Sequence, residues 1–207
     1  MLDFARAILV VAVSIAAGCA APGSPARHFL AKFGAPNPAI DLVAVCWGYG
    51  CRQQPEVDMS AAWAAIASAF AAPPATAKDE RERVAEAVAA WERAAAESTP
   101  IGLDVGGTFE GVGESGQLDC VDEAVNTTRL LVLLQESRLL RFHVAEAPAT
   151  RGAFLLGWPH TSAVLMEKQT GARFAVDSWF HDNGVMAEVV PLDTWLAGWA
   201  PAEGATP

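Results

Sequence analysis

The stretch of sequence that decides the fold is DCVDEAVNTTRLLVLLQESRLL, residues 119–140. Asp119 is of a type that caps the free amide groups at a helix start, and the acidic residues after it complement the positive end of the helix dipole. Residues 130–134 are apolar on every side, which is typical of a helix buried inside a domain. The sequence therefore predicts a buried central helix over 119–140, with Cys120 in its first turn.

Two further helices are predicted before this segment. Residues 59–71 and 79–97 place apolar side chains three and four positions apart, as the inner face of a helix does. In the second of these helices we expect Glu80 and the charged residues 81–83 to face solvent. Residues 100–118 contain six glycines and have no regular period, which indicates a long loop of the kind that often borders a site.

Strands are predicted mainly after the central helix. Residues 40–47 are interpreted as a strand that runs into a turn, and residues 140–144 alternate like a strand. Residues 160–167 and 173–180 flank a segment of turn composition, which predicts an antiparallel hairpin. A short amphipathic helix around Trp195 closes the chain. Helices followed by antiparallel strands indicate the α+β class and a single domain over residues 40–207.

The first 39 residues are expected to lie outside this domain. Residues 8–17 form a mainly apolar run that is too short to span a membrane but has the length of a signal-peptide core. The end of this segment, AAGC at 16–19, resembles a bacterial lipobox, in which the cysteine is acylated after cleavage; an ordinary secretory signal is the competing interpretation. Residues 1–19 thus predict an exported protein, periplasmic or outer-membrane-anchored, whose only membrane contact is the lipid. Residues 20–39, rich in proline, glycine and alanine, are predicted to be a tether.

The charge balance argues against nucleic acid as a partner. The chain has 24 acidic and 14 basic residues and a net charge of −10. Nucleic-acid binding depends on lysine and arginine side chains that displace counterions from phosphates. We therefore expect no nucleic-acid partner.

Cys120, His160 and Asp177 are the residues predicted to carry chemistry. A cysteine is a strong nucleophile as a thiolate, and a helix start and a neighbouring imidazole both favour loss of its proton. A hairpin loop near residues 169–170 places His160 diagonal to Asp177 on the neighbouring strand. An aspartate at that distance can orient the imidazole and stabilise its charged form. The sequence thus predicts a Cys-His-Asp triad.

At these residues the chain resembles the transglutaminase-like cysteine proteinase superfamily, including its bacterial periplasmic branch. That family has its nucleophile at the start of a central helix in a Gly-x-Cys-x-Asp-x-Ala-like pattern, here DCVDEA at 119–124, followed by a histidine that begins a strand and an aspartate on the next strand. The match covers about residues 79–180, with Glu123 where the family commonly has an aromatic residue. The resemblance implies a papain-like α+β fold and acyl transfer at the amide bonds of a protein or peptide substrate.

The residues around the triad are given supporting roles. The backbone amide of Cys120 is the expected oxyanion donor, with Gln117 and Trp179 as supporting residues, and Asp122 is expected to cap the helix or bind a cation. Water as acyl acceptor gives a peptidase or amidase, and an amine gives a transglutaminase. The sequence leaves both acceptors open.

Three further hypotheses compete with a Cys-His-Asp hydrolase. The chain could be a non-catalytic binding protein of the same fold, or a peptidoglycan endopeptidase of the NlpC/P60 type. The third hypothesis is a metal site that adds His181 to the triad residues. We expect no cofactor, with calcium dependence left open.

The four cysteines differ in their expected roles. Cys19 is assigned to the lipid anchor. Cys46 and Cys51 are five positions apart and can close a small loop as a disulfide in an oxidising compartment. Cys120 is left unpaired, and an unpaired thiol in an exported domain is either buried or reactive.

Overall fold

The computed structural model describes residues 24–34, 37–152 and 159–202. Its helices are α1 (Pro25–Leu30), α2 (Ser60–Ala69), α3 (Ala77–Ala95), α4 (Cys120–Glu136) and α5 (Leu192–Leu196), with 3₁₀ turns η1 (Ala31–Phe33) and η2 (Pro100–Leu103). Its strands are β1 (Val43–Ala44), β2 (Glu56–Val57), β3 (His143–Arg151), β4 (His160–Glu167), β5 (Arg173–Asp177) and β6 (Glu188–Pro191). The predicted signal peptide and Cys19 lie outside the described residues.

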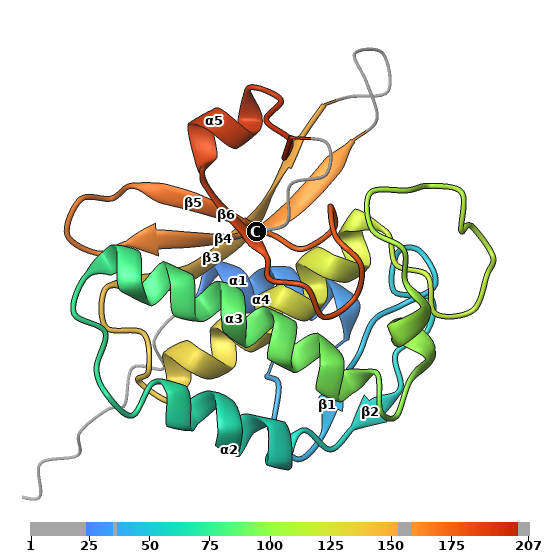
Figure 1. Cartoon of the computed structure of the whole chain (residues 1–207), viewed down its shortest axis with the longest axis horizontal. Helices are drawn as coiled ribbons and strands as arrows, with labels where there is room; N and C mark the ends of the chain where they lie inside the picture. Colours follow the sequence, from blue (N-terminus) through green and yellow to red (C-terminus); the bar gives the residue numbers. More distant parts are fainter. Residues whose placement is uncertain (1–23, 35–36, 153–158, 203–207) are drawn as a thin grey trace, which may run out of the picture.

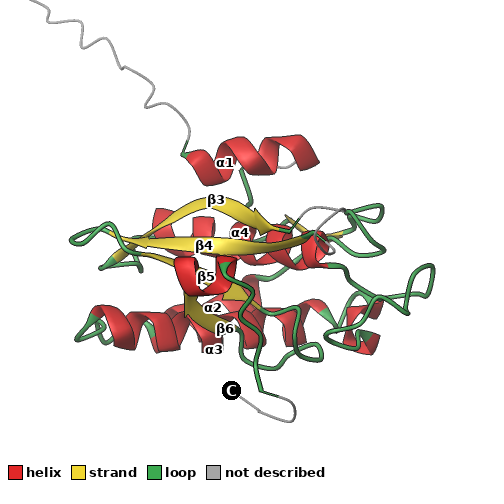
Figure 2. Ribbon diagram, turned by 90° about the horizontal axis from the view of Figure 1, so that it is seen from above, coloured by secondary structure: helices red, strands yellow, loops and turns green. Residues whose placement is uncertain are grey.

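The main sheet is antiparallel, with strand order β3-β4-β5-β6, and β1 and β2 pair separately. The helix α4 packs on β3 and β4, while α1 lies beside β3 and α3 lies beside β6 (Figures 1 and 2). The short helix α5 packs on β5 and β6. Helices and antiparallel sheets in this order confirm the α+β class.

The two faces of the sheet bury different sets of side chains. The face toward α4 contributes to the larger core, and the opposite face packs against α5. On the α4 side the sheet presents Ala145, Ala163, Leu165 and Val176. On the α5 side it presents Val164 and Ala175, which pack with Val190, Leu192 and Trp195. The alternation of neighbouring residues between two faces is the period of a strand.

The β4–β5 hairpin is confirmed in its predicted register. Ala163 pairs with Val176 and Val164 pairs with Ala175, so His160 and Asp177 point to the same face. The strand predicted over 140–144 is longer than expected and runs to Arg151. Its register shifts between residues 146 and 149, around Pro148, because proline has no N–H to give to the ladder and fits a bulge on an edge strand. The strand predicted over 40–47 is reduced to the two residues of β1.

The predicted tether is wrong for residues 25–33. These residues form α1 and η1, in which Ala26 and Leu30 are fully buried. The two buried side chains are four positions apart and therefore lie on one face of the helix, which packs against β3 and α4. The folded domain thus includes residues before position 40.

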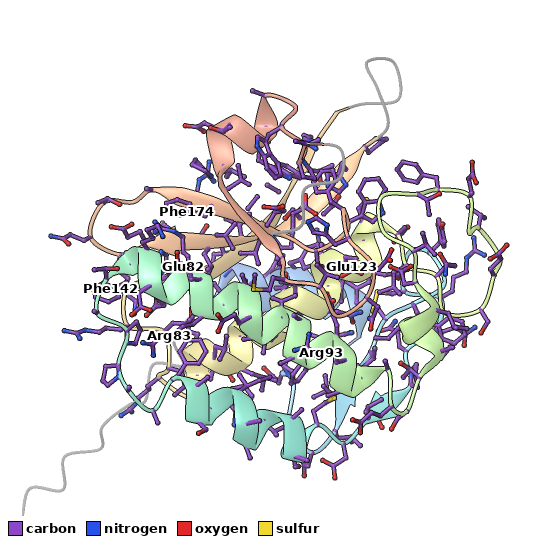
Figure 3. All side chains as sticks on the ribbon, viewed as in Figure 1. Glu82, Arg83, Arg93, Glu123, Phe142 and Phe174 are labelled. Carbon is purple, nitrogen blue, oxygen red and sulfur yellow. A yellow bond between two sulfur atoms is a disulfide. The ribbon has the colours of Figure 1, made fainter. Side chains whose placement is uncertain are left out.

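The prediction that Glu80 faces solvent is also wrong. Its carboxylate is fully buried and accepts hydrogen bonds from the backbone amides of residues 141–143 and from Nδ1 of His143 at 2.8 Å. Burial alone would raise the pKa of Glu80, but these hydrogen bonds outweigh it and hold the pKa below its usual value. Glu82, in contrast, points outward from the same helix (Figure 3).

Among the described helices, none has the length and apolar character needed to cross a membrane.

Candidate active site

The thiol of Cys120 lies at the first turn of α4, against the start of β4. Cys120 is 5% exposed, and its Sγ is 3.8 Å from the carbonyl oxygen of Pro159. The backbone N–H of Thr161 donates a hydrogen bond to the sulfur. The sulfur is therefore in contact with the backbone on both sides of His160.

In the first turn of α4, the backbone amide of Cys120 is not used to cap the helix. Asp119 is the predicted N-cap: its Oδ1 accepts hydrogen bonds from the amides of Val121 and Asp122 at 3.0 and 2.9 Å. The amide of Glu123 bonds to the Asp119 carbonyl. The Cys120 amide lies close to its own sulfur and lowers the thiol pKa. This is the position in which an N–H can also stabilise an oxyanion formed on a carbonyl bound to that sulfur.

The imidazole of His160 is fixed by Asp177. Nε2 of His160 lies 2.7 Å from Oδ2 of Asp177, and the indole N–H of Trp195 donates to the same oxygen at 2.6 Å. Because a carboxylate can only accept, Nε2 carries the proton and Nδ1 has a free lone pair. Nδ1 is buried and has no hydrogen-bond partner among the described residues. The histidine therefore has the tautomer that a general base requires.

Three aromatic rings surround this imidazole. The ring centroids of Trp179, Phe180 and Trp195 lie 4.8, 5.3 and 5.4 Å from that of His160. Trp179, which was predicted to have a supporting role, thus lies beside His160. Phe180 was not predicted, and Trp195 was predicted only as part of a closing helix. These rings exclude water from the His160–Asp177 hydrogen bond, which strengthens it.

The Cys120 thiol is protonated at neutral pH. Burial is the main cause that raises its pKa to about 11, and the negative charges of Asp119 and Asp177 add to it. The amides of Thr161 and Cys120 itself lower the pKa but do not outweigh burial. Any attack by this sulfur therefore requires that a base remove its proton during the reaction.

Gln117 does not take the predicted oxyanion position. Its side-chain Nε2 donates to the carbonyl of Leu103 at 2.5 Å, and its Oε1 accepts from the amide of Val105 at 3.3 Å. Both ends of the amide are thus used to hold the 100–118 loop.

An apolar cavity of about 440 Å³ opens in front of Cys120. The described part of the chain contributes three segments to its walls: the loop closed by the disulfide, the 100–118 loop, and the junction of α4 with the start of β4. The described residues that line it are Tyr49, Phe109, Val112, Asp119, Cys120, Val121 and Pro159. A substrate carbonyl could reach the sulfur through this cavity.

The loop closed by the Cys46–Cys51 disulfide is hydrogen-bonded directly to α4. The predicted Cys46–Cys51 disulfide is present. Both oxygens of Asp122 accept backbone N–H groups, from Tyr49 at 2.7 Å and from Cys51 at 2.5 Å, and the same side chain completes the capping box. Asp122 therefore caps the helix, as predicted, and holds Tyr49 at the cavity wall. Burial, followed by the charge of Asp119, raises the pKa of Asp122 to about 7.

The remaining candidate metal residue, His181, pairs with a carboxylate outside the triad. His181 pairs through Nε2 with Oε1 of Glu188 at 3.1 Å. Within the described part of the chain, no group of three or more histidine, cysteine, aspartate or glutamate side chains could hold a metal ion. The structure therefore does not bring His181 together with Cys120, His160 and Asp177 as a metal site.

Gly106 fixes the distance between the loop and the site. Its amide donates to Oδ1 of Asp182 at 3.0 Å, and the next amide, of Gly107, donates to the carbonyl of Trp179 at 2.7 Å. A Cβ at position 106 would lie 2.1 Å from the carbonyl carbon of His181, which is backbone and cannot rotate away. The loop can approach the site this closely only with glycine at 106.

Replacing Gly106 by alanine is expected to destabilise the fold by about 1–3 kcal/mol, because the loop must move away from residues 179–182. The free energy of unfolding from urea titrations measures this. Gly102→Ala is the control, because its Cβ would meet the Ala96 side chain no closer than 3.2 Å. Equal losses in the two variants would contradict the close contact as the cause.

Comparisons with known proteins identify no relative of this chain: no protein-family model, curated protein or solved structure matches it.

Proposed function

We propose that this protein is an exported cysteine peptidase or amidase, with a papain-like fold of the transglutaminase-like type. The observation that carries the proposal is the hydrogen bond of 2.7 Å between His160 and Asp177, which leaves Nδ1 of His160 free. The two chain neighbours of His160, Pro159 and Thr161, contact the Cys120 sulfur. A nucleophile, a base and an orienting carboxylate in chain order Cys-His-Asp are the parts that acyl transfer needs.

The reaction would proceed through a thioester. Nδ1 of His160 takes the proton from Cys120 while the sulfur attacks the amide carbonyl, and Asp177 stabilises the imidazolium. The backbone amide of Cys120 hydrogen-bonds the oxyanion of the tetrahedral intermediate. The C–N bond then breaks, and the imidazolium gives its proton to the leaving amine. Water attacks the thioester with His160 again as base, which releases the acid and restores the thiol.

This mechanism differs from one that starts with a thiolate–imidazolium pair. With the Cys120 pKa raised to about 11, the resting pair is a neutral thiol and a neutral imidazole. Proton transfer and attack are therefore coupled, as in serine hydrolases. We favour water over an amine as acyl acceptor because a periplasmic enzyme works in abundant water.

Acylation of Cys120 tests the proposal. With p-nitrophenyl butyrate we expect a burst of nitrophenol close to one equivalent of enzyme, a butyryl group on the Cys120 peptide by mass spectrometry, and its loss on further incubation. Cys120→Ala should give neither burst nor adduct. A wild-type protein that gives no adduct at Cys120 would overturn the proposal.

A second candidate is a non-catalytic binding protein with the same fold. The observation in its favour is the raised pKa of Cys120, because burial and two neighbouring carboxylates disfavour the thiolate. Such a protein would give no adduct in the acylation experiment and would keep its biological role as Cys120→Ala.

A further inference from the structure

The cavity in front of Cys120 has a composition that points to one kind of ligand group. Its walls come from Phe109, Val112, Val121, Pro159 and the ring of Tyr49. No lysine, arginine or histidine is among the described residues that line it. Phe109 and Val112 are 40% and 60% exposed at the rim, which leaves apolar surface for a ligand to cover.

Carboxylates surround this apolar surface. Asp119 is the one charged residue among the described lining residues. The hydrogen bonds that it accepts from the amides of Val121 and Asp122 keep it in place. The charges of Asp104, Asp119, Asp122 and Glu114 all act on the hydroxyl of Tyr49 and, after burial, raise its pKa. A negatively charged ligand would lose its hydration here, and the one charge among the described lining residues, that of Asp119, has the same sign.

Tyr49 adds an aromatic ring to the cavity wall. Its hydroxyl oxygen is buried, so a ligand in the cavity would contact the ring and not the hydroxyl. The described part of the wall therefore offers mainly apolar contact, as binding sites for apolar groups commonly do.

We propose that this cavity binds the acyl half of the substrate and selects an uncharged, apolar side chain next to the scissile amide, with Tyr49, Phe109 and Val112 as specificity-determining residues. Because the cavity includes the nucleophile, a group bound in it lies next to the scissile amide. The inference names the substrate class of the proposed function and rests on that function for its chemistry. Its preference for neutral over anionic groups can also be measured without catalysis.

Alkylation of Cys120 provides that measurement. N-butyl iodoacetamide and iodoacetate carry an apolar neutral and an anionic group on the same reactive carbon. We compare their rates at Cys120 by mass spectrometry, in folded protein and in urea-unfolded protein with the disulfide intact. The ratio of neutral to anionic rates should be at least 10-fold higher in the folded protein. An equal ratio in both states would overturn the inference.

Two matched variants locate the preference in the cavity. Val112→Lys adds a positive charge at the cavity rim and should lower the ratio at least threefold. Val105→Lys makes the same change on the same loop at a residue that is 55% exposed and does not line the cavity, and should change the ratio less than twofold. Equal effects of the two variants would place the selectivity in the general surface charge and contradict the inference.

Amide substrates separate this inference from the proposed function. Acyl-leucine and acyl-aspartate amides of aminomethylcoumarin differ only in the side chain beside the scissile bond, and we expect kcat/KM to favour leucine at least 100-fold. Cleavage of both at equal rates would retain the proposed function and overturn the inference. If neither is cleaved and Cys120 takes no butyryl group, but the alkylation preference holds, the proposed function fails and the selectivity of the cavity stands.

Discussion

Replacing His160 by glutamine is expected to lower kcat for the leucine amide by about 10⁴-fold or more. The reason lies in the protonation state of the nucleophile. Because the pKa of Cys120 is raised to about 11, almost no thiolate is present at neutral pH to react without a base. Nδ1 of His160 is the free basic nitrogen of the triad, and glutamine provides none.

The measurement is steady-state hydrolysis, with urea unfolding as a check that the variant folds. His181→Gln is the matched control, because His181 pairs with Glu188 and is outside the triad, so we expect its kcat to stay within about threefold of wild type. A His160→Gln variant that keeps more than a tenth of the wild-type kcat would contradict the assigned base.

Asp177→Asn serves as the comparison variant and separates two roles of the carboxylate. The indole N–H of Trp195 donates to the oxygen that accepts from His160, so it should keep the asparagine oxygen, and not its NH₂ group, toward the imidazole. The tautomer of His160 is then retained, and only the charge that stabilises imidazolium is lost. We therefore expect a loss of about 10²-fold, less than the ~10⁴-fold found where such a change also produces the wrong tautomer.

The His160–Asp177 pair could be predicted from the sequence because it depends on local geometry. A short turn fixes the register of a hairpin, and the register determines which side chains share a face. The helix start at Cys120 was predictable for the same reason, since capping is specified by residues within one turn. Both predictions needed no information about distant parts of the chain.

Trp195 and Glu80 were not assigned correctly because their roles depend on distant segments. Trp195 reaches Asp177 only after β6 and α5 place it on the far face of the sheet. Glu80 is buried because the amides of residues 141–143, more than 60 positions away, replace its hydration. An acidic residue beside other charged residues in a helix carries no local sign that such partners exist.

One side of α4 carries polar residues whose helical spacing is visible in the sequence. Asp122, Asn126 and Arg129 are spaced four and three apart, so they form one polar stripe along a buried helix. Asn126 bonds both the amide and the carbonyl of Cys46, and Arg129 donates to the carbonyl of Ala44. A polar stripe on a buried helix therefore indicated that irregular backbone packs there, as the disulfide loop does.

The residue that departs from the family pattern, Glu123, is part of a buried pair of acids. Figure 3 labels it at the first turn of α4, and it is buried. Ser178 donates to its Oε2 at 2.5 Å, and its carboxyl group hydrogen-bonds that of Glu92 on α3. Oε1 of Glu92 has no other donor among the described residues, so a proton held between the two carboxyls supplies the missing bond. The pair connects two helices to the residue that follows Asp177.

Raising the pH from 5 to 8 is expected to destabilise the fold, because this pair must release its shared proton. Burial is the main cause that raises the pKa of Glu92 to about 7 and that of Glu123 well above its usual value, and the charges of neighbouring carboxylates add to this effect. The unfolded chain loses the Glu92 proton near pH 4.5, whereas the folded protein keeps it to about pH 7, and the pKa of Glu123 is shifted in the same direction. The folded state therefore binds more protons between these values, and its stability, fully present below about pH 4.5, falls as the pH rises through 7.

Glu92→Gln should remove the share of this dependence that comes from Glu92. Its amide can donate to Glu123 at any pH, and its carbonyl oxygen can still accept from the amide of Gly184, as Oε2 does at 2.9 Å. A carboxyl pKa moved from 4.5 to about 7 corresponds to roughly 3 kcal/mol, so we expect the variant to be more stable than wild type by about 1–3 kcal/mol at pH 8 and similar to it at pH 5. Urea titrations followed by tryptophan fluorescence at the two pH values measure this. Glu86→Gln, an exposed position on the same helix, should keep the wild-type pH dependence; a Glu92→Gln variant that does the same would contradict the shared proton.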